Sequence, residues 1–433
     1  MSKQLAKRIQ AKKAVVAVIG LGYVGLPLAM GFAKKGFKVY GVDSDRDRVK
    51  RLKNKESYIL DIAAGDITRA IQKNAFEPTN DFQTLRLADV VIICVPTPLK
   101  RKYTPDISYI LNAVKSVRKF LKKDMLVVLE STTYPGTTEE LLKPELEKSG
   151  LKAEVDFYLA FSPERIDPGN IKYGLAKIPK LVGGLSARSG ELAKLLYGQI
   201  IEKVFTVSSA KTAEMTKLVE NSFRIVNIGW ANEVAMICHK LGIDVWEVIE
   251  AAKTKPFGFM PFYPGLGAGG HCIPDDPLYL YWKAKHHGVS SKFLKLSADI
   301  NAFMPQYALN RLAEALRENK ILLRRSRILV IGVTYKKDVK DLRKSPALKF
   351  IELLQRSHCK VSYFDPLIPY LDINSIQLKS MKWNKKTLAG FDCAVIATDH
   401  SNIDYELLRA ESKLIFDTRN VYRHVKEEKI IRL

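Results

Sequence analysis

The feature that most constrains this chain is the order of patterns within residues 14–43. A short apolar run, A-V-V-A-V-I at 14–19, leads directly into the G-x-G-x-x-G turn G-L-G-Y-V-G at 20–25. A helical stretch follows and ends at Gly36, and a second apolar run stops at Asp43. Strand, glycine turn, helix, strand and acid in this order predict a parallel βαβ unit that binds a dinucleotide.

The acid at the end of this unit bears on which dinucleotide binds. Asp43 lies 21 residues after Gly22, where a carboxylate can bond the ribose hydroxyls of the adenosine. Its charge would repel the 2′-phosphate of NADP, so NAD is favoured, although Arg46 and Arg48 could receive that phosphate. The cofactor-binding residues predicted from this unit are Gly20, Gly22, Tyr23, Val24, Gly25, Asp43 and Arg48.

Apolar runs suited to buried strands recur at 88–95, 125–129 and 157–161, and each is followed by polar residues. Ligands of an open parallel sheet gather at the carboxyl ends of its strands. Thr132 and Glu164, which follow the second and third of these runs, are therefore candidate site residues. The alternatives are a helix-capping hydroxyl and a solvated acid.

A long helix is predicted from the capping residues Ser208 and Ser209 to about His239, with Gly242 as its stop. Lys217 and Asn221 are four residues apart and share one face, so both could point at one ligand. The alternative is a solvated pair. The apolar stripe of this helix is Met215, Leu218, Val219, Phe223 and Val226.

A glycine-rich loop, P-G-L-G-A-G-G-H-C-I-P-D-D-P at 264–277, carries Cys272. Glycines allow close approach to a ligand, and a thiol held in such a loop can attack it as the thiolate. A surface loop with an incidental cysteine is the alternative. Asp276 and Pro277 predict the cap and first residue of a helix over 278–287. The next helix, over about 291–319, contains Pro305, which we expect to kink or break it.

The last third of the chain repeats the first in outline. Strands are predicted at 327–333, 360–364, 393–397 and finally 414–416, and K-V-S-Y-F-D echoes the earlier K-V-Y-G-V-D. The first turn lacks the full glycine set, which argues for a different ligand there, and it leads into a cationic loop at 335–343. This loop could bind an anion, and the alternative is a solvated charge run. The fold class is therefore α/β, with two doubly wound Rossmann-like domains joined by a central helical domain. The predicted domain boundaries are 1–207, 208–320 and 321–433.

Charge, apolar runs and cysteines limit the kinds of partner that this chain is expected to bind. The 433 residues carry a net charge of +24, which suits polyanions such as nucleic acid, an anionic membrane or phosphorylated small molecules, or else serves general solubility. The lysines are spread along the chain without a nucleic-acid-binding signature, and no apolar run reaches the ~20 residues that span a bilayer. Five scattered cysteines show neither zinc spacing nor a disulfide framework. We therefore expect a cytoplasmic protein without nucleic acid, membrane insertion or metal.

A dinucleotide beside a nucleophilic thiol predicts aldehyde oxidation, in which the thiol adds to the aldehyde, hydride leaves and a thioester is hydrolysed. Two other functions compete with it. A two-electron dehydrogenase acting on a phosphorylated hydroxy acid would leave Cys272 without a task. A basic nucleotide-binding regulator without catalysis would explain the charge but not the thiol, the lysine and the acids together.

With these residues assembled, the chain resembles the UDP-glucose/GDP-mannose dehydrogenase family over nearly its whole length. The matching motifs are G-L-G-Y-V-G-L-P, V-P-T-P, E-S-T-T-Y-P-G-T, F-S-P-E-R, A-E-M-T-K-L-V-E-N, G-A-G-G-H-C-I-P and T-Y-K-K-D-V-K-D-L-R. The resemblance implies four-electron oxidation of a sugar C6 alcohol to a carboxylate, with two NAD⁺ and no metal. It also implies a homodimer or larger homo-oligomer, with a core built by the two long helices.

The resemblance assigns roles to individual residues. Cys272 would hold the sugar as a thiohemiacetal and then as a thioester, and Lys217 with Asn221 would stabilise the oxyanion. Asp276 would position or activate a water, and Glu164 or Thr132 would serve the water that hydrolyses the thioester. Further cofactor contacts would come from Pro96, Thr97, Thr132 and Arg343. Substrate contacts would come from Glu164, Arg165, Lys217, Asn221, Gly269 and Lys337.

Two positions beside the thiol distinguish branches of the family. UDP-glucose enzymes commonly carry serine or tyrosine before the cysteine and lysine before the acid, whereas this chain has His271 and Asp275. The motif G-G-H-C-I-P, with V-P-T-P and S-T-T-Y-P-G-T, is more similar to the branch acting on UDP-N-acetylhexosamines. The expected substrate is UDP-N-acetylglucosamine, followed by UDP-N-acetylmannosamine and then UDP-glucose.

Overall fold

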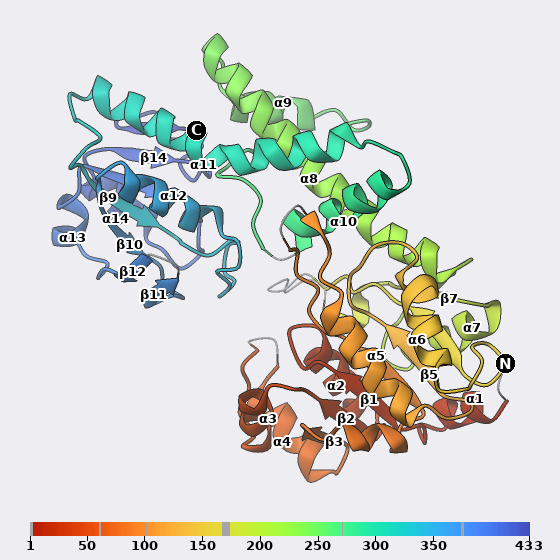
Figure 1. Cartoon of the computed structure of the whole chain (residues 1–433). Helices are drawn as coiled ribbons and strands as arrows, with labels where there is room; N and C mark the ends of the chain where they lie inside the picture. The colour runs from red at the N-terminus through yellow and green to blue at the C-terminus, as the bar shows by residue number, and fades with distance from the viewer. Residues whose placement is uncertain (1–2, 60–61, 101–102, 167–173, 271, 374–375) are drawn as a thin grey trace. The chain divides into compact units, whose positions relative to one another are not determined.

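The computed structural model describes residues 3–59, 62–100, 103–166, 174–270, 272–373 and 376–433, and Cys272 by its backbone only (Figure 1). The chain forms two compact units. The first is Met1–Glu220 with Trp282–Val289, and the second is Asn221–Tyr281 with Ser290–Leu433. The division falls within the long helix α8 (Ala210–Leu241) and again within α10 (Cys272–His286).

The first unit is built on an eight-stranded sheet in the order β3-β2-β1-β4-β5-β6-β7-β8. Its first six strands are parallel and have the Rossmann order, whereas β7 pairs antiparallel with β6. The first residue of β7 therefore lies at the edge where β5 and β6 end. The strands are β1 Val16–Ile19, β2 Val39–Val42, β3 Phe76–Thr79, β4 Val90–Ile93, β5 Leu126–Leu129, β6 Tyr158–Phe161, β7 Lys180–Gly184 and β8 Val204–Val207.

Helices cover both faces of this sheet, which is why its strands are continuous apolar runs. Val16 and Val18 face the cluster that includes α2 and α7, whereas Ala17 and Ile19 face the cluster that includes α5 and α6. The helices are α1 Lys3–Gln10, α2 Gly25–Lys34, α3 Arg46–Lys53, α4 Ala64–Gln72, α5 Ser108–Phe120, α6 Lys143–Glu147 and α7 Ala187–Tyr197, with short turns η1 Phe82–Leu87, η3 Thr138–Leu142 and η4 Leu175–Lys177.

Four helices lie between the two sheets in chain order: α8, α9 (Val245–Lys253), α10 (Cys272–His286) and α11 (Lys292–Glu318). The predicted start of α10 is wrong, because the helix begins at Cys272 and Pro277 lies inside it. Asp276 is therefore not a helix cap, and its carboxylate accepts a hydrogen bond from Asn221 instead. The predicted break at Pro305 is also absent, since α11 runs through it as one helix.

The second unit contains a five-stranded parallel sheet in the order β10-β9-β13-β14-β15, the other common doubly wound order. The strand at 414–416 is not the last, because β15 pairs with it. The two Rossmann-like sheets confirm the predicted fold class. Its elements are β9 Arg327–Ile331, α12 Pro346–Arg356, β10 Lys360–Phe364, the hairpin β11 Tyr370–Ile373 and β12 Ile376–Lys379, α13 Lys385–Ala389, β13 Cys393–Ile396, α14 Tyr405–Glu411, β14 Ile415–Asp417 and β15 Ile430–Arg432.

Two further features of the described residues concern membranes and metal ions. None of the described helices combines the length and apolarity needed to cross a membrane. Within the same residues, no group of three or more histidine, cysteine or acidic side chains is arranged to hold a metal ion.

Candidate active site

The turn after β1 has space only for glycine at two of its three glycine positions. A Cβ on Gly25 would lie 1.8 Å from the carbonyl oxygen of Gly20. Gly20 has φ +93°, and a Cβ there would lie 2.4 Å from the carbonyl oxygen of Cys94. A Cβ on Gly22 would meet nothing within 4 Å, so this glycine leaves open space against exposed backbone. That is the arrangement a dinucleotide pyrophosphate requires, and the turn fits the predicted cofactor.

Asp43 is anchored at the end of β2 by backbone groups. Its Oδ2 accepts a hydrogen bond from Leu21 N–H at 2.7 Å, and its Oδ1 accepts one from Asp45 N–H at 2.9 Å. Arg48 lies 3.4 Å from Asp43 and 3.3 Å from Asp45. Because two carboxylates already engage this guanidinium, Arg48 is poorly placed to receive the 2′-phosphate of NADP, and the geometry favours NAD.

The other predicted cofactor residues of the first unit follow β1, β4 and β5. Tyr23 is 44% exposed. Pro96 is exposed and Thr97 is buried after β4, and Thr132 is half-buried after β5. All of them emerge at carboxyl ends of parallel strands, where ligands of such sheets bind.

A buried group of three charges lies at the same edge of the sheet. Lys180 Nζ lies 3.0 Å from Glu130 Oε2 and 2.9 Å from Glu164 Oε2. Glu130 follows β5, Glu164 follows β6, and Lys180 begins the antiparallel β7. The other oxygen of Glu164 accepts hydrogen bonds from the N–H groups of Arg165 and Ile166, both at 2.6 Å. The carboxylate of Glu164 is therefore fixed from both sides.

The three groups titrate differently. Burial raises the pKa of Glu130 to about 7 in spite of the neighbouring ammonium. Burial also opposes ionisation of Glu164, but Lys180 and the two backbone N–H groups outweigh it and lower its pKa. Burial disfavours the charge of Lys180, but the two carboxylates more than compensate and raise its pKa. Lys180 and Glu164 are thus held ionised, while Glu130 readily takes up a proton near neutrality.

The predicted lysine of α8 contacts this edge through the main chain. Lys217 is buried, and its Nζ donates a hydrogen bond to the carbonyl oxygen of Glu164 at 2.5 Å. Arg165, predicted to bind substrate, forms an ion pair with Glu220 and donates to the carbonyl of Pro179. The structure therefore brings Lys217 and Glu164 together, with the ammonium oriented by the segment after β6.

In the second unit, the predicted catalytic groups meet on two helices. Asn221 Nδ2 on α8 donates to Asp276 Oδ2 on α10 at 2.5 Å, and both residues are buried. Cys272 begins α10, four residues before Asp276 and so about one helical turn away. His271 and the Cys272 side chain lie outside the described residues.

Two cations of the loop after β9 are paired with acidic side chains, one inside the loop and one after β13. Arg343 makes a two-pronged contact with Asp341, and Lys337 Nζ lies 3.6 Å from Asp399. A Cβ on Gly269, a predicted substrate residue, would lie 2.8 Å from Tyr335 and Pro346. Gly269 thus packs against the residues flanking this loop.

Comparison with known proteins identifies the family. Three sequence profiles match in chain order: the NAD binding domain of the UDP-glucose/GDP-mannose dehydrogenase family at residues 14–201, its central domain at 211–302 and its UDP binding domain at 329–424. The chain belongs to the UDP-glucose/GDP-mannose dehydrogenase family. It is therefore an oxidoreductase that uses NAD and a UDP-sugar.

Individual relatives agree over nearly the whole chain. A UDP-N-acetyl-D-mannosamine dehydrogenase of Pyrococcus horikoshii is 36% identical over 417 residues, 94% of this chain and 96% of the relative. A UDP-N-acetyl-D-glucosamine 6-dehydrogenase of Pseudomonas aeruginosa is 39% identical over 355 residues, 82% of this chain and 83% of the relative. The solved structure of a P. horikoshii UDP-D-ManNAc dehydrogenase has a TM-score of 0.86 at 35% identity and covers 96% of this chain and 98% of its own.

Several residues that hold the candidate site residues in place were not selected from the sequence. Glu130 and Lys180 clamp Glu164, and the buried Glu214 ties α8 to the η3 turn through Gly136 and Thr138. Burial raises the pKa of Glu214 to about 7. Glu130 could have been noticed because it directly follows a strand, but Lys180 shows no such signal before the direction of β7 is known.

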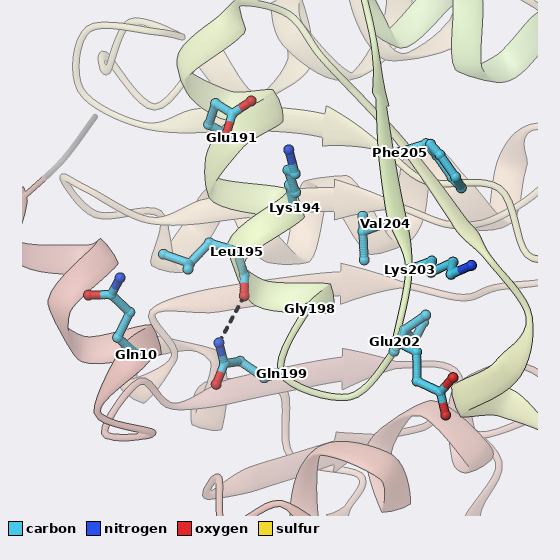
Figure 2. Close-up of a pocket in the computed structure, with 11 residues that line it drawn as sticks. Gln10, Glu191, Lys194, Leu195, Gly198, Gln199, Glu202, Lys203, Val204 and Phe205 are labelled. Atoms are coloured by element: carbon cyan, nitrogen blue, oxygen red, sulfur yellow. Dashed lines mark hydrogen bonds between the residues drawn. The ribbon is translucent and has the colours of Figure 1, made fainter.

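A hollow of about 830 Å³ lies elsewhere on the first unit (Figure 2). It is lined from three elements, with Gln10 near the end of α1, Lys194 on α7 and Phe205 on β8. None of the predicted site residues lines it. Its walls mix acidic, basic and amide side chains, and we assign it no part in the reaction.

Proposed function

We propose that this enzyme oxidises the C6 hydroxyl of a UDP-N-acetylhexosamine to the carboxylate through an intermediate on Cys272. The observation that carries the substrate class is that relatives of 36% and 39% identity are named for two such sugars, UDP-N-acetylmannosamine and UDP-N-acetylglucosamine. UDP-N-acetylglucosamine remains our first expectation. The mannosamine epimer is supported about as well.

NAD⁺, when bound, would accept the hydride in each of the two oxidation steps, and the protein supplies orientation and charge. Gly22 leaves room for the pyrophosphate, and Asp43 lies where it can bond the adenosine ribose. Pro96, Thr97 and Thr132 border the same edge. Arg343, on the loop after β9 of the second unit, is a further proposed cofactor contact. These groups hold the cofactor while the sugar alcohol loses its proton and hydride.

Lys217 is the proposed oxyanion stabiliser. The carbonyl of Glu164 accepts one of its three ammonium hydrogens, which leaves others to donate to a developing negative charge. Asn221 lies one turn further along α8 and is held by Asp276. The amide is thereby fixed in orientation before substrate binds.

Cys272 is the proposed nucleophile. Its thiolate adds to the C6 aldehyde to give a thiohemiacetal, and loss of a second hydride gives a thioester that water hydrolyses. A thiol at the first turn of α10 gains from the helix dipole, which favours the thiolate. Asp276 would orient a water near the sulfur from the same turn.

Glu164 and Thr132 are proposed to serve the hydrolytic water. Lys180 favours the ionised form of Glu164, the form that can accept a proton. The proposed substrate contacts are Arg165, Gly269 and Lys337. The two cations now pair with Glu220 and Asp399, and they would have to leave these acids to bind phosphate or sugar oxygens.

The test is a panel of UDP-hexoses with NADH counted against sugar consumed. We expect two NADH per sugar, with UDP-N-acetylglucosamine or UDP-N-acetylmannosamine giving the highest kcat/KM and UDP-glucose a lower one. One NADH per sugar with an aldehyde product would contradict the four-electron reaction. Preference for UDP-glucose would contradict the substrate class.

We also propose that the enzyme is a homodimer or larger homo-oligomer. Met215, Val219 and Phe223 on α8 are 38%, 49% and 48% exposed, although they belong to one apolar stripe. Such a stripe is typical of a surface that another protein covers. A cytoplasmic location is proposed on the cysteines, since Cys94, Cys238, Cys359 and Cys393 are unpaired. Light scattering of the purified enzyme measures the oligomeric mass.

A further inference from the structure

One ion pair fastens the first turn of α10 to the loop after β9. Asp275 is 2% exposed, and its Oδ1 contacts the ammonium of Lys344. The side chain of Lys344 is 49% exposed, so a half-exposed cation reaches a carboxylate that is almost wholly buried. Such a carboxylate needs compensation for its lost hydration, and the lysine provides it.

Backbone contacts join the same two segments. Gly270 N–H donates to the carbonyl of Arg343 at 3.0 Å. A Cβ on Gly270 would lie 2.9 Å from the ring of Tyr335, and one on Gly269 would lie 2.9 Å from the carbonyl of Lys344. The two glycines therefore allow the loop before Cys272 to approach residues 335–346 more closely than any other residue type would.

The turn that begins α10 is thus held at two adjacent residues by different partners. Asn221 on α8 bonds Asp276, and Lys344 bonds Asp275. Cys272 lies three residues before Asp275 and four before Asp276, which is about one helical turn. Since a helical turn moves as a unit, the position of either acid sets the position of the residue that begins the helix.

We propose that Lys344 is a positioning residue that acts through Asp275 to hold the Cys272 turn in the place the reaction requires. The inference deepens the proposed function and rests on it. Arg343, the neighbour of Lys344, is a proposed cofactor contact and Lys337 a proposed substrate contact. One folded loop therefore carries both ligand contacts and the anchor of the thiol turn.

The experiment is a double-mutant cycle on Asp275→Asn and Lys344→Met. Each single variant should lower kcat roughly 10–100-fold, the loss expected for a misplaced reacting group, with KM for NAD within about threefold of the parent. The double variant should be no worse than the worse single one, because the lysine acts only through the acid. Lys344→Arg keeps the cation and should keep most of the activity.

The matched control is Lys349→Met. Lys349 is 50% exposed and pairs with Glu352 at 3.1 Å, so it resembles Lys344 in exposure and charge but lies on α12. Its kcat should stay within about twofold of the parent. Additive losses in the double variant, or an equal loss from Lys349→Met, would overturn the proposal.

A second readout does not depend on turnover. The rate at which iodoacetamide alkylates Cys272, followed by peptide mass spectrometry, should change at least about threefold in Lys344→Met and stay unchanged in Lys349→Met. An unchanged rate in Lys344→Met would overturn the positioning role even if activity fell. If the parent enzyme oxidised no UDP-sugar, the proposed function would fail, and the alkylation rates would still decide whether Lys344 positions the thiol turn.

Discussion

Replacement of Lys180 by methionine should destabilise the first unit in a strongly pH-dependent way. The substitution removes the cation that lies between Glu130 and Glu164, 3.0 Å from the first carboxylate and 2.9 Å from the second. Methionine keeps about the length of the lysine stem, but it also removes the cation–π contact of Lys180 Nζ with the Tyr197 ring, whose centroid is 5.2 Å away. Two buried carboxylates would then face each other, with the half-buried Cys94 and the buried Tyr197 as uncharged neighbours.

The size of the stability loss and its pH dependence follow from the burial of the two carboxylates. Removal of one partner from a buried ion pair costs about 3–5 kcal/mol, the loss we expect at pH 7. Without Lys180, Glu164 should follow Glu130, whose pKa is raised from 4.5 to about 7, and take up a proton on folding. A raised carboxyl pKa stabilises the fold below pH 4.5, and this contribution is lost as pH rises through about 7. At 1.36 kcal/mol per pH unit, this single proton makes the deficit about 3 kcal/mol smaller at pH 4.5 than at pH 7.

The assay is native-state hydrogen exchange of peptides covering β5, β6 and β7, corrected for the intrinsic pH dependence of exchange. This measurement reports the opening free energy of the sheet and does not require the whole chain to unfold in one step. A deficit below about 1 kcal/mol at pH 7, or one of the same size at pH 5, would refute the role of Lys180 as counter-charge.

Two further variants separate charge from packing. Lys180→Arg keeps the cation and should lose far less stability than the methionine variant. Glu130→Gln combined with Lys180→Met leaves one buried carboxylate instead of two, so it should be more stable than Lys180→Met alone at pH 7. If the double variant were less stable, repulsion between the carboxylates would not explain the deficit.

Two further predictions concern cofactor and thiol. Gly22→Ala should leave the melting temperature within about 2 °C but weaken NAD binding at least tenfold in a fluorescence titration, because its Cβ enters open space that the pyrophosphate needs. Gly25→Ala should instead lower the melting temperature, since its Cβ would lie 1.8 Å from the carbonyl oxygen of Gly20. Cys272→Ser should lose steady NADH production while binding NAD like the parent, and full activity in this variant would exclude the thiol from the reaction.

The parts of the site that could be predicted are those encoded within one supersecondary unit. The glycine turn and Asp43 lie within 30 residues of each other, and local rules relate them without knowledge of the rest of the fold. Helical periodicity places Lys217 and Asn221 on one face of α8, and their catalytic roles, which the family resemblance implies, stay predictions. Cofactor and family therefore followed from the sequence.

The start of α10 shows where local rules fail. Asp276 followed by Pro277 is a good cap and first residue, and no local signal favours a helix beginning at Cys272. Contacts from Asn221 and Lys344, 55 and 69 residues away, hold the two acids on a turn that is already helical. Tertiary contacts of this kind override a capping signal worth about 1 kcal/mol.

Lys180 could not be predicted for a topological reason. The run K-L-V-G-G reads as a strand, but nothing in it says that β7 runs against β6. If β7 were parallel, Lys180 would begin at the opposite edge, far from the ends of β5 and β6. Strand direction alone therefore decides whether this lysine is a surface charge or the partner of Glu130 and Glu164.

Asp43 follows β2 and Asp365 follows β10 in the same local pattern, but the two carboxylates have different partners. Asp43 Oδ2 accepts Leu21 N–H, and Asp365 Oδ2 accepts Val333 N–H, both at 2.7 Å, so each carboxylate first closes its own βαβ turn. The two sites differ in the second group that contacts Oδ2 of each aspartate. Asp43 meets the half-exposed Arg48, which a ribose can displace.

Asp365 instead meets His400, a fully buried side chain from the segment after β13. Asp338 N–H donates to its Nδ1, so Nε2 carries the hydrogen and donates to the carboxylate at 3.2 Å. A buried histidine cannot be exchanged for a ribose without opening the core. The motif K-V-S-Y-F-D therefore has the strand and the acid of a dinucleotide site but not its accessible oxygen, which is why only the first sheet is assigned the NAD.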